Sequence, residues 1–256
     1  MVNQWAMGID VGGTSVKGGV VDLRTGTLTG AVVRRTTPVP ARIEACMPVI
    51  AEVAHALERD AELRGLGVLP LGVALSGDVR DGRHTSGVNL HDSWMDAPAL
   101  DLLVAAIGRP VVILNDADAA GLGEAAWGAA AGVAGVVVVL TFGTGIGSAI
   151  LLDGRVLPNS GFGQLPFQGR PAEQLLSAVA RERRRLSWAR WAADVSSYLA
   201  VVDELLRPER IVLGGGVIAA RDRFWSVLRP TCELVPAGLG PDAGIAGAAR
   251  FAADIR

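Results

Sequence analysis

One pattern of strands and glycine turns occurs twice in this chain and constrains the fold more than any other feature. Between Trp5 and Arg35, short apolar runs separated by glycine turns predict three antiparallel strands. A second apolar run with a glycine-rich turn spans residues 135–157, and helical and strand-like segments follow each copy. This repetition predicts an α/β protein of two related lobes. The cleft between such lobes is the expected ligand site.

Composition narrows the possible partners. With 256 residues, half of them hydrophobic, the chain is long enough for two cores. A formal net charge of −2 argues against nucleic acid as a main partner, because a phosphate backbone requires a basic surface. Cys46 and Cys232 lie far apart in the chain and match no metal-ligand or disulfide spacing, so we expect a protein of the reducing cytoplasm. The start, MVNQWAMGID, predicts no signal peptide.

Residues 125–152 contain no charged side chain, which is a feature of membrane-spanning helices. Glycines and threonines interrupt this stretch, so we expect a helix, a strand, a loop and a second strand, and no membrane partner. Helical periodicity predicts further helices over residues 41–57, 172–182 and 188–206.

The segment DVGGTSVK carries the first candidate phosphate loop. Its backbone N–H groups, the Thr14 hydroxyl and the Lys17 ammonium are suited to a phosphate, and Asp10 to a magnesium ion, directly or through water. Gly12 and Gly13 allow the backbone to turn tightly. The alternative is a β-hairpin turn that serves only the fold.

The segment TFGTGIGS carries a second candidate. Glycines at 143, 145 and 147 allow close backbone approach to an anion, and Thr141 and Thr144 add hydroxyls. The lysine of a Walker loop is missing. The alternative is a glycine-rich hairpin that serves packing.

The segment LNDADAAGLGE places Asp116 between a buried strand and a helix. A carboxylate there can accept a proton from a hydroxyl nucleophile. Asn115, Asp116 or Asp118 can instead cap the helix, and one residue can do one task while its neighbour does the other.

The segment IVLGGGVI predicts a strand, a glycine turn and a helix start. Such a turn, at Gly214, Gly215 and Gly216, can lie against a nucleotide base or phosphate. A plain strand-to-helix connection is the alternative.

In their order and spacing, these motifs resemble the ROK family of sugar kinases, in the actin/hexokinase-like superfamily. The resemblance is closest to its compact actinobacterial branch of polyphosphate glucokinases. GIDVGGTSVKGGVVDLRTG, LNDADAAGLGE, LTFGTGIGSAI, LGGGVI and AGIAGAA carry it, and they cover nearly the whole chain. It implies two ribonuclease-H-like lobes of the ASKHA fold with a cleft between them, Mg²⁺-dependent phosphoryl transfer and a homodimer. We expect the N-terminal lobe at 1–116 with 243–256, and the C-terminal lobe at 117–242.

The resemblance also assigns roles. Asp116 is expected to be the general base that takes the proton of a primary hydroxyl as it attacks the donor's terminal phosphoryl group. Asn115 and Asp116, with Gly77 and Asn89, are expected to bind the acceptor. The expected donor-binding residues are Asp10, Gly12, Gly13, Thr14, Lys17, Thr141, Gly143, Thr144, Gly145, Gly214, Gly215 and Gly216.

The segment GFGQ departs from the family pattern. Glucose-phosphorylating relatives carry Glu and, three positions later, His there, and this chain has Gly161 and Gln164. Glu173 matches a further family sugar ligand. An unpaired buried polar group costs about 1–3 kcal/mol. The absence of both side chains therefore weakens the binding of glucose, unless other groups replace their hydrogen bonds.

Three interpretations follow. The favoured one is a kinase for another hexose-like sugar or a cyclitol. The others are a glucokinase with a compensated acceptor site, and a non-catalytic sugar-binding or sensor protein. The donor is ATP or polyphosphate. Asp92, where polyphosphate users carry a basic residue, favours ATP. The basic run Arg181–Arg185 suits polyphosphate, although a solvated helix end is the simpler explanation.

The histidines match no family ligand. His84 and His91 lie in a loop near the expected cleft, and we expect a surface role for them rather than a substrate contact.

Overall fold

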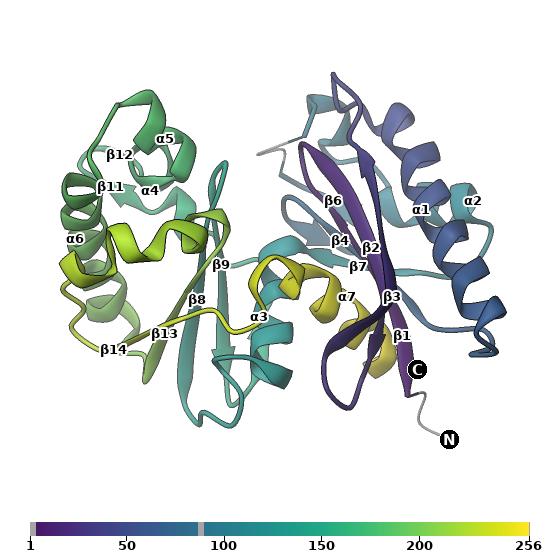
Figure 1. The fold of residues 1–256 in the computed structure, drawn as a ribbon. Helices are drawn as coiled ribbons and strands as arrows, with labels where there is room; N and C mark the ends of the chain where they lie inside the picture. The colour runs from purple at the N-terminus through teal and green to yellow at the C-terminus, as the bar shows by residue number, and fades with distance from the viewer. Residues whose placement is uncertain (1–3, 87–89, 256) are drawn as a thin grey trace. The chain divides into compact units, whose positions relative to one another are not determined.

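The computed structural model describes residues 4–86 and 90–255. The chain divides into two compact units, Met1–Gly123 with Asp242–Arg256, and Glu124–Pro241 (Figure 1). Helix α3 (Asp116–Trp127) runs across the first expected lobe boundary, at 116/117. The two units thus have other bounds than the lobes expected from the sequence, and the expected lobe boundaries stay a prediction.

The first unit is built on a five-stranded sheet in the order β3-β2-β1-β4-β7. β1, β2 and β3 form an antiparallel meander, and β4 and β7 extend the sheet in parallel with β1. The strands of this unit are β1 (Trp5–Val11), β2 (Ser15–Asp22), β3 (Thr27–Thr36), β4 (Leu71–Leu75), β7 (Val112–Asn115) and the short hairpin β5 (Val79–Arg80) and β6 (Arg83–His84).

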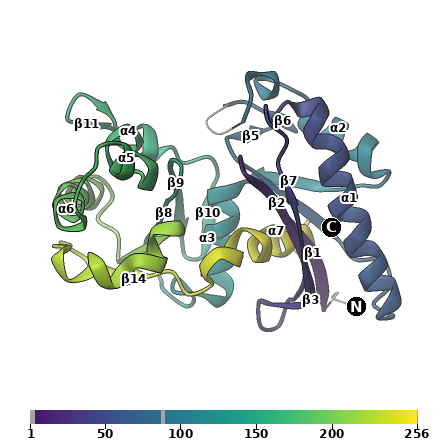
Figure 2. The same ribbon diagram turned by 45° about the horizontal axis from the view of Figure 1, so that its top comes forward.

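Helices cover both faces of this sheet (Figures 1 and 2). On one face lie α1 (Ile43–Leu63) and α2 (Ala99–Ile107), and on the other lies α7 (Ala243–Asp254). The buried side chains of α1 recur three and four residues apart, as the sequence periodicity predicts, and they pack into the core beneath the sheet. The helix runs six residues beyond its predicted end at residue 57, and Arg64 ends it.

Small residues let α7 approach the sheet at backbone distance. A Cβ atom at Gly8 in β1 would overlap the Ile245 carbonyl of α7, and one at Gly72 in β4 would overlap the Ala248 carbonyl. A Cβ atom at Gly247 would likewise overlap the Ala119 carbonyl of α3. The glycines of these strands therefore allow the helix to pack closely.

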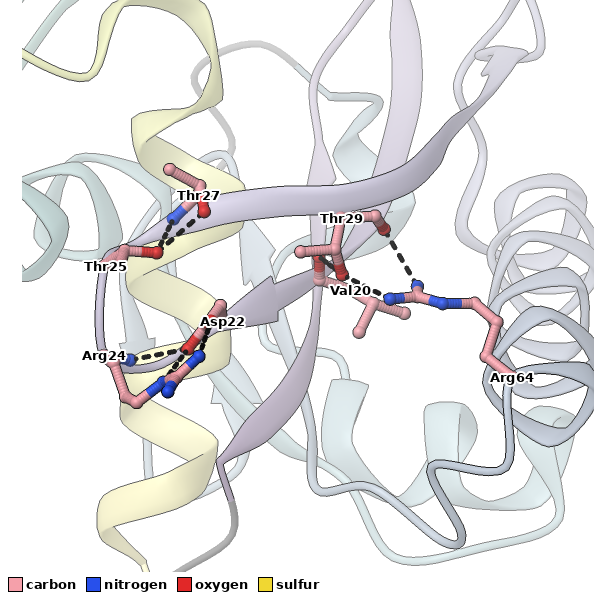
Figure 3. Close-up of polar contacts among 7 residues, drawn as sticks. All are labelled: Val20, Asp22, Arg24, Thr25, Thr27, Thr29 and Arg64. Atoms are coloured by element: carbon pink, nitrogen blue, oxygen red, sulfur yellow. Dashed lines mark hydrogen bonds and ion pairs between the residues drawn. The ribbon is translucent and has the colours of Figure 1, made fainter.

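Two arginines stabilise the turn end of the β2–β3 hairpin (Figure 3). At the turn, the Asp22 carboxylate accepts hydrogen bonds from the backbone N–H and side chain of Arg24, which lowers the pKa of Asp22. Farther along, the Arg64 guanidinium donates to the carbonyl oxygen and hydroxyl of Thr29, and that hydroxyl donates to the Val20 carbonyl. The end of α1 is thereby attached to β3.

The second unit repeats the arrangement with a sheet in the order β10-β9-β8-β13-β14. β8, β9 and β10 are antiparallel, and β13 and β14 extend the sheet in parallel with β8. The prediction of two related ribonuclease-H-like lobes is therefore confirmed. The strands are β8 (Val136–Phe142), β9 (Ile146–Leu152), β10 (Arg155–Leu157), β13 (Arg210–Gly214), β14 (Glu233–Pro236) and the pair β11 (Pro166–Phe167) and β12 (Arg170–Pro171).

One helical prediction for this unit needs correction. The helix expected over 172–182 is broken into α4 (Ala172–Leu176) and α5 (Ala178–Arg183), because Ser177 is extended and its hydroxyl caps α5 by accepting from the Ala180 N–H. The helix start expected after the Gly214–Gly216 turn is a 3-10 segment over Gly216–Arg223, interrupted at Ala220. By contrast, α6 (Trp188–Leu206) has the predicted bounds.

The uncharged stretch 125–152 forms the end of α3, then β8, a loop and β9, as expected. Across residues 4–86 and 90–255, every helix is too short or too polar to cross a membrane. The remaining short elements are 3-10 turns: η1 (Asp92–Trp94), η2 (Phe162–Gln164), η4 (Trp225–Val227) and η5 (Gly240–Asp242).

The contact of Gly8 with α7 predicts a large stability effect. Replacement Gly8→Ala forces a methyl group against the Ile245 carbonyl, and such overpacking costs about 1–3 kcal/mol. Gly12→Ala is the matched control, because its Cβ would lie 3.5 Å from the nearest atom, the Ser15 carbonyl oxygen. Urea unfolding should show a lower free energy of unfolding for Gly8→Ala than for Gly12→Ala. Equal values for the two variants would contradict this account of the packing.

Candidate active site

The polar groups of the first unit gather where its parallel strands end. β1, β4 and β7 run side by side, with Val11 paired to Leu75 and Leu75 paired to Asn115. Asp10 lies at the end of β1, Ser76 follows β4 and Asp116 follows β7. The carboxyl ends of parallel strands share one sheet edge, the usual location of ligand sites in α/β proteins.

Asn115 caps α3 and also holds the neighbouring strand end. Its Oδ1 accepts hydrogen bonds from the backbone N–H groups of Ala117, at 2.8 Å, and Asp118, at 2.9 Å. Its Nδ2 donates to the Gly77 carbonyl at 2.9 Å. Of the three residues that the sequence offered as a helix cap, Asn115 therefore caps α3. The expected contact of Asn115 with the acceptor stays a prediction.

Asp116 is the first residue of α3 and is half-buried. Its Oδ1 accepts from the Ala117 N–H at 2.9 Å, and its carboxylate also accepts a hydrogen bond from the Ser76 hydroxyl. Desolvation, and after it the Asp10 carboxylate, raise the pKa of Asp116 to about 7, although these hydrogen bonds act in the opposite direction. A carboxylate with a pKa near neutrality is suited to accept a proton.

Asp10 is paired with Lys17 across the β1–β2 hairpin. The Lys17 ammonium lies 2.9 Å from Asp10 Oδ2, and both side chains are largely buried. Gly244, near the start of α7, also packs against this carboxylate, since a Cβ atom there would lie 3.2 Å from Asp10 Cγ. The charged head of Lys17 therefore lies at the first candidate phosphate loop.

The loop between β1 and β2 is a tight turn supported by Thr37. The Gly12 N–H donates to the Ser15 carbonyl at 3.1 Å. The buried Thr37 hydroxyl donates to the Gly12 carbonyl at 2.6 Å, and its backbone N–H donates to the Thr14 carbonyl at 3.1 Å. Thr14 itself is exposed. The hairpin-turn alternative is thus correct as a description of the fold, and a phosphate-binding role stays a prediction.

In the second unit, the two glycine turns lie side by side at the ends of β8 and β13. Gly214 pairs with Thr141, and Gly215, with φ of 82°, packs against the backbone of Phe142 so closely that a Cβ atom would overlap it. The next segment, 143–145, is closed by a hydrogen bond from the Gly143 N–H to the Gly145 carbonyl at 3.0 Å. The structure therefore brings together the candidate donor-binding residues of this unit.

The residues expected to bind the far end of the acceptor adjoin that turn. Gln164 Nε2 donates to Glu173 Oε1 at 2.7 Å, and Glu173 Oε2 accepts weakly from the Ile146 N–H at 3.4 Å. Gly161 is exposed, and a Cβ atom there would meet nothing within 4 Å. Gln164 thus orients a carboxylate, while Gly161 leaves open space.

Two residues that the sequence did not single out, Ser76 and Thr37, also shape the site, together with Gly77 and His84. Ser76 and Thr37 are buried hydroxyls, and an isolated Ser or Thr carries no sequence signal of its own. Gly77 has φ of 112° and turns the chain after β4. The surface role expected for His84 is wrong, because its side chain is fully buried beneath this turn. Asn89 lies outside the described residues.

The described part of the chain holds no cluster of three His, Cys, Asp or Glu side chains suited to a metal. Magnesium usually binds one or two carboxylates, with water and substrate phosphates as its other ligands. Asp10 and Asp116 are close enough for one carboxylate to raise the pKa of the other. These hard oxygen ligands therefore fit a magnesium ion that arrives with a donor.

Comparison with known protein sequences relates the chain to sugar kinases. Residues 6–163 match the ROK family. The chain is 40% identical over 243 residues to a polyphosphate glucokinase of Mycobacterium leprae (strain TN), covering 94% of this chain and 72% of that protein.

Solved structures of sugar kinases superpose on this chain. An inorganic polyphosphate/ATP-glucomannokinase from Arthrobacter sp. strain KM superposes with a TM-score of 0.92 at 42% identity, over 99% of this chain and all of that one. A ROK family glucokinase from Streptomyces griseus, in complex with glucose and AMPPNP, gives a TM-score of 0.78 at 25% identity, over 96% and 98% of the two chains. The chain therefore belongs to the ROK family, as a member of its sugar-kinase branch.

Proposed function

We propose that this sugar kinase transfers a phosphoryl group from ATP or polyphosphate to the primary hydroxyl of a glucose-type hexose. The observation that carries the proposal is the Asp116 carboxylate, held at the common edge of β1, β4 and β7 with a pKa near neutrality. The names of the relatives reported above support the hexose and both donors.

Asp116 acts as the general base. It accepts the proton of the primary hydroxyl as the hydroxyl oxygen forms a bond to the terminal phosphorus and the donor's bridging oxygen leaves. The Ser76 hydroxyl and the Ala117 N–H fix the carboxylate for this step. Catalysis of phosphoryl transfer depends mostly on positioning and on neutralising charge, so a fixed base is what the reaction needs from this residue.

Each unit carries glycine loops suited to the phosphates of a donor. In the first unit, Lys17 and the backbone of residues 12–14 supply positive charge and N–H groups. In the second unit, residues 143–145 and the Gly214–Gly216 turn do so. Magnesium, held by Asp10, would neutralise phosphate charge when bound. A homodimer and a cytoplasmic location stay predictions.

The pair of Gln164 and Glu173 supports a glucose-type acceptor in place of the altered specificity favoured from the sequence. Gln164 occupies the position of the family histidine and still holds Glu173 by a hydrogen bond of 2.7 Å. The carboxylate expected to bind sugar hydroxyls is thus kept in place by an amide that replaces part of the imidazole's role.

A second candidate function rests on Gly161. The open space at this position suits an acceptor that is larger than glucose or differently substituted at its far end. Under this alternative, the same base and donor loops phosphorylate a substituted sugar or a cyclitol.

The donor preference is not decided by charge alone. Asp92 is exposed at the start of η1, where an acid disfavours a polyanion. The arginines at the end of α5 are partly engaged within their own unit: Arg183 donates to the Gln174 carbonyl and Arg184 to the Leu175 carbonyl. Arg181 stacks on Trp188, with 4.0 Å from its guanidinium carbon to the ring centroid. Both donors are therefore retained in the proposal.

Replacement Asp116→Asn tests the role of the base. We expect turnover of glucose with either donor to fall by about 10²–10⁴-fold, the contribution typical of general base catalysis. The cap by Asn115 stays in place, so circular dichroism should show an unchanged fold. Asp101→Asn, an exposed carboxylate of α2 in the same unit, is the matched control and should keep full turnover. Wild-type turnover by Asp116→Asn would remove Asp116 as the base.

The raised pKa of Asp116 predicts a pH dependence of stability. The folded protein binds this proton more tightly than the unfolded chain, whose carboxyl has a pKa of about 3.8. The stabilisation is therefore complete below about pH 4 and is lost as the pH rises towards 7. Without magnesium and substrate, the free energy of unfolding of wild type relative to Asp116→Asn should fall between these values and level off above them. A difference that does not change with pH would contradict the raised pKa.

Replacement Gln164→Ala tests the acceptor contact. Glu173 loses its hydrogen bond of 2.7 Å, and we expect the KM for glucose to rise by up to about tenfold while the KM for the donor stays unchanged. Gln174→Ala, an exposed neighbour on α4, is the matched control. Steady-state kinetics that show equal effects of the two substitutions would exclude the role of Gln164.

A further inference from the structure

His84 lies directly beneath the turn that follows β4, on the side away from solvent. The side chain is fully buried, and its ring meets the indole of Trp94 edge to face at 5.5 Å. His84 begins no motif and matches no ligand of the family. Its position therefore calls for an explanation from its contacts.

Within residues 4–86 and 90–255, the ring makes one hydrogen bond, to the residue that follows β4. His84 Nε2 lies 2.7 Å from the Ser76 carbonyl oxygen. A carbonyl only accepts, so Nε2 carries the hydrogen of this bond. Nδ1 is buried and has no hydrogen-bond partner among the residues that the structure describes. The described hydrogen bond of the ring is therefore the one to the Ser76 carbonyl.

Ser76 is in turn held at its backbone. Its N–H donates to the Val11 carbonyl of β1 at 3.3 Å and its carbonyl accepts from His84, while its side chain lies near enough to Asp116 to lower the pKa of that carboxyl as a hydrogen-bond donor. Ser76 is buried, and the hydrogen bonds of its backbone fix the place from which its side chain reaches Asp116. His84 therefore helps to set the direction from which Ser76 meets the carboxylate.

The next residue shows how closely the ring fits. Gly77 has φ of 112°, and a Cβ atom there would lie 2.6 Å from His84 Nε2. The Gly77 carbonyl accepts from Asn115, the neighbour of Asp116. From below, the His84 backbone N–H donates to the Ala97 carbonyl at 3.0 Å, which anchors the ring to the body of the unit.

We propose that His84 is a positioning residue for phosphoryl transfer, which acts on Asp116 through the carbonyl and hydroxyl of Ser76. This inference rests on the proposed role of Asp116 as the base. It predicts that removing the Nε2 donor lowers kcat and leaves donor binding unchanged, because the ring bonds Ser76 and packs against Trp94 and Gly77, which are not expected to bind the donor.

The test compares His84→Phe, Ser76→Ala, the double variant and His55→Phe. Phenylalanine keeps the ring and removes the donor. His55 is the matched control, because its Nε2 also bonds a backbone carbonyl, that of Ile107, at 3.0 Å, away from the strand ends. We expect kcat for glucose phosphorylation to fall about tenfold or more in His84→Phe, with the donor's KM unchanged, and to stay near wild type in His55→Phe.

Two further results separate positioning from a purely structural role. Glutamine places an amide near the location of Nε2, so His84→Gln should recover most of kcat. The double variant should lose no more activity than the more affected single variant, because both changes interrupt one path to Asp116. Losses that multiply in the double variant, or a His84→Phe that loses no more kcat than His55→Phe, would overturn the proposal.

The outcome stays decisive if His84→Phe does not fold. His84→Asn, whose amide is too short to reach the Ser76 carbonyl, then takes its place beside His84→Gln, and equal kcat in these two would overturn the proposal. Asp116→Asn is assayed alongside. Full turnover in that variant refutes the proposed base, whereas an inactive Asp116→Asn with an unaffected His84→Phe refutes only the role of His84.

Discussion

The hydrogen bonds of Asn115 are the constraint on which the first unit's site depends. One side chain caps α3 through its Oδ1 and holds the turn after β4 through its Nδ2. The end of β7, the end of β4 and the start of α3 are thereby joined at a single point. Asp116, the next residue, has its direction fixed by this junction and by Ser76, which is itself bonded to β1. A carboxylate held in this way is desolvated and lies near Asp10, and its raised pKa follows from both.

The second unit applies the same architecture to a different task. Its sheet repeats the order of the first, and its candidate groups again lie where β8 and β13 end. Here the strand ends carry glycines in place of carboxylates. Gly215 is required by its positive φ and by its contact with Phe142, and the resulting turn exposes backbone N–H groups suited to anions. The same sheet order thus places a carboxylate at one sheet edge and glycine turns suited to anions at the other.

Much of this arrangement was predictable because it is local in the sequence. Alternating apolar runs with glycine turns indicate the meanders, and a polar residue between a strand and a helix indicates a cap or a base. The break at Ser177 was missed because the side-chain periodicity continues through it, while the chain's preference for a cap there depends on packing. Ser76, Thr37 and His84 were missed or misplaced because their roles come from hydrogen bonds between segments far apart in the chain, which periodicity and spacing do not report.

We propose that this chain phosphorylates the primary hydroxyl of a glucose-type hexose with ATP or polyphosphate. The most direct measurement crosses both donors with glucose, mannose, amino sugars and cyclitols in the presence of magnesium, and locates the phosphate in each product by phosphorus NMR. We expect phosphorylation of glucose or mannose at the primary hydroxyl by at least one donor. Efficient phosphorylation of only amino sugars or cyclitols would support the alternative based on Gly161. No product from any pair, with sugar binding still detectable, would contradict the kinase assignment itself.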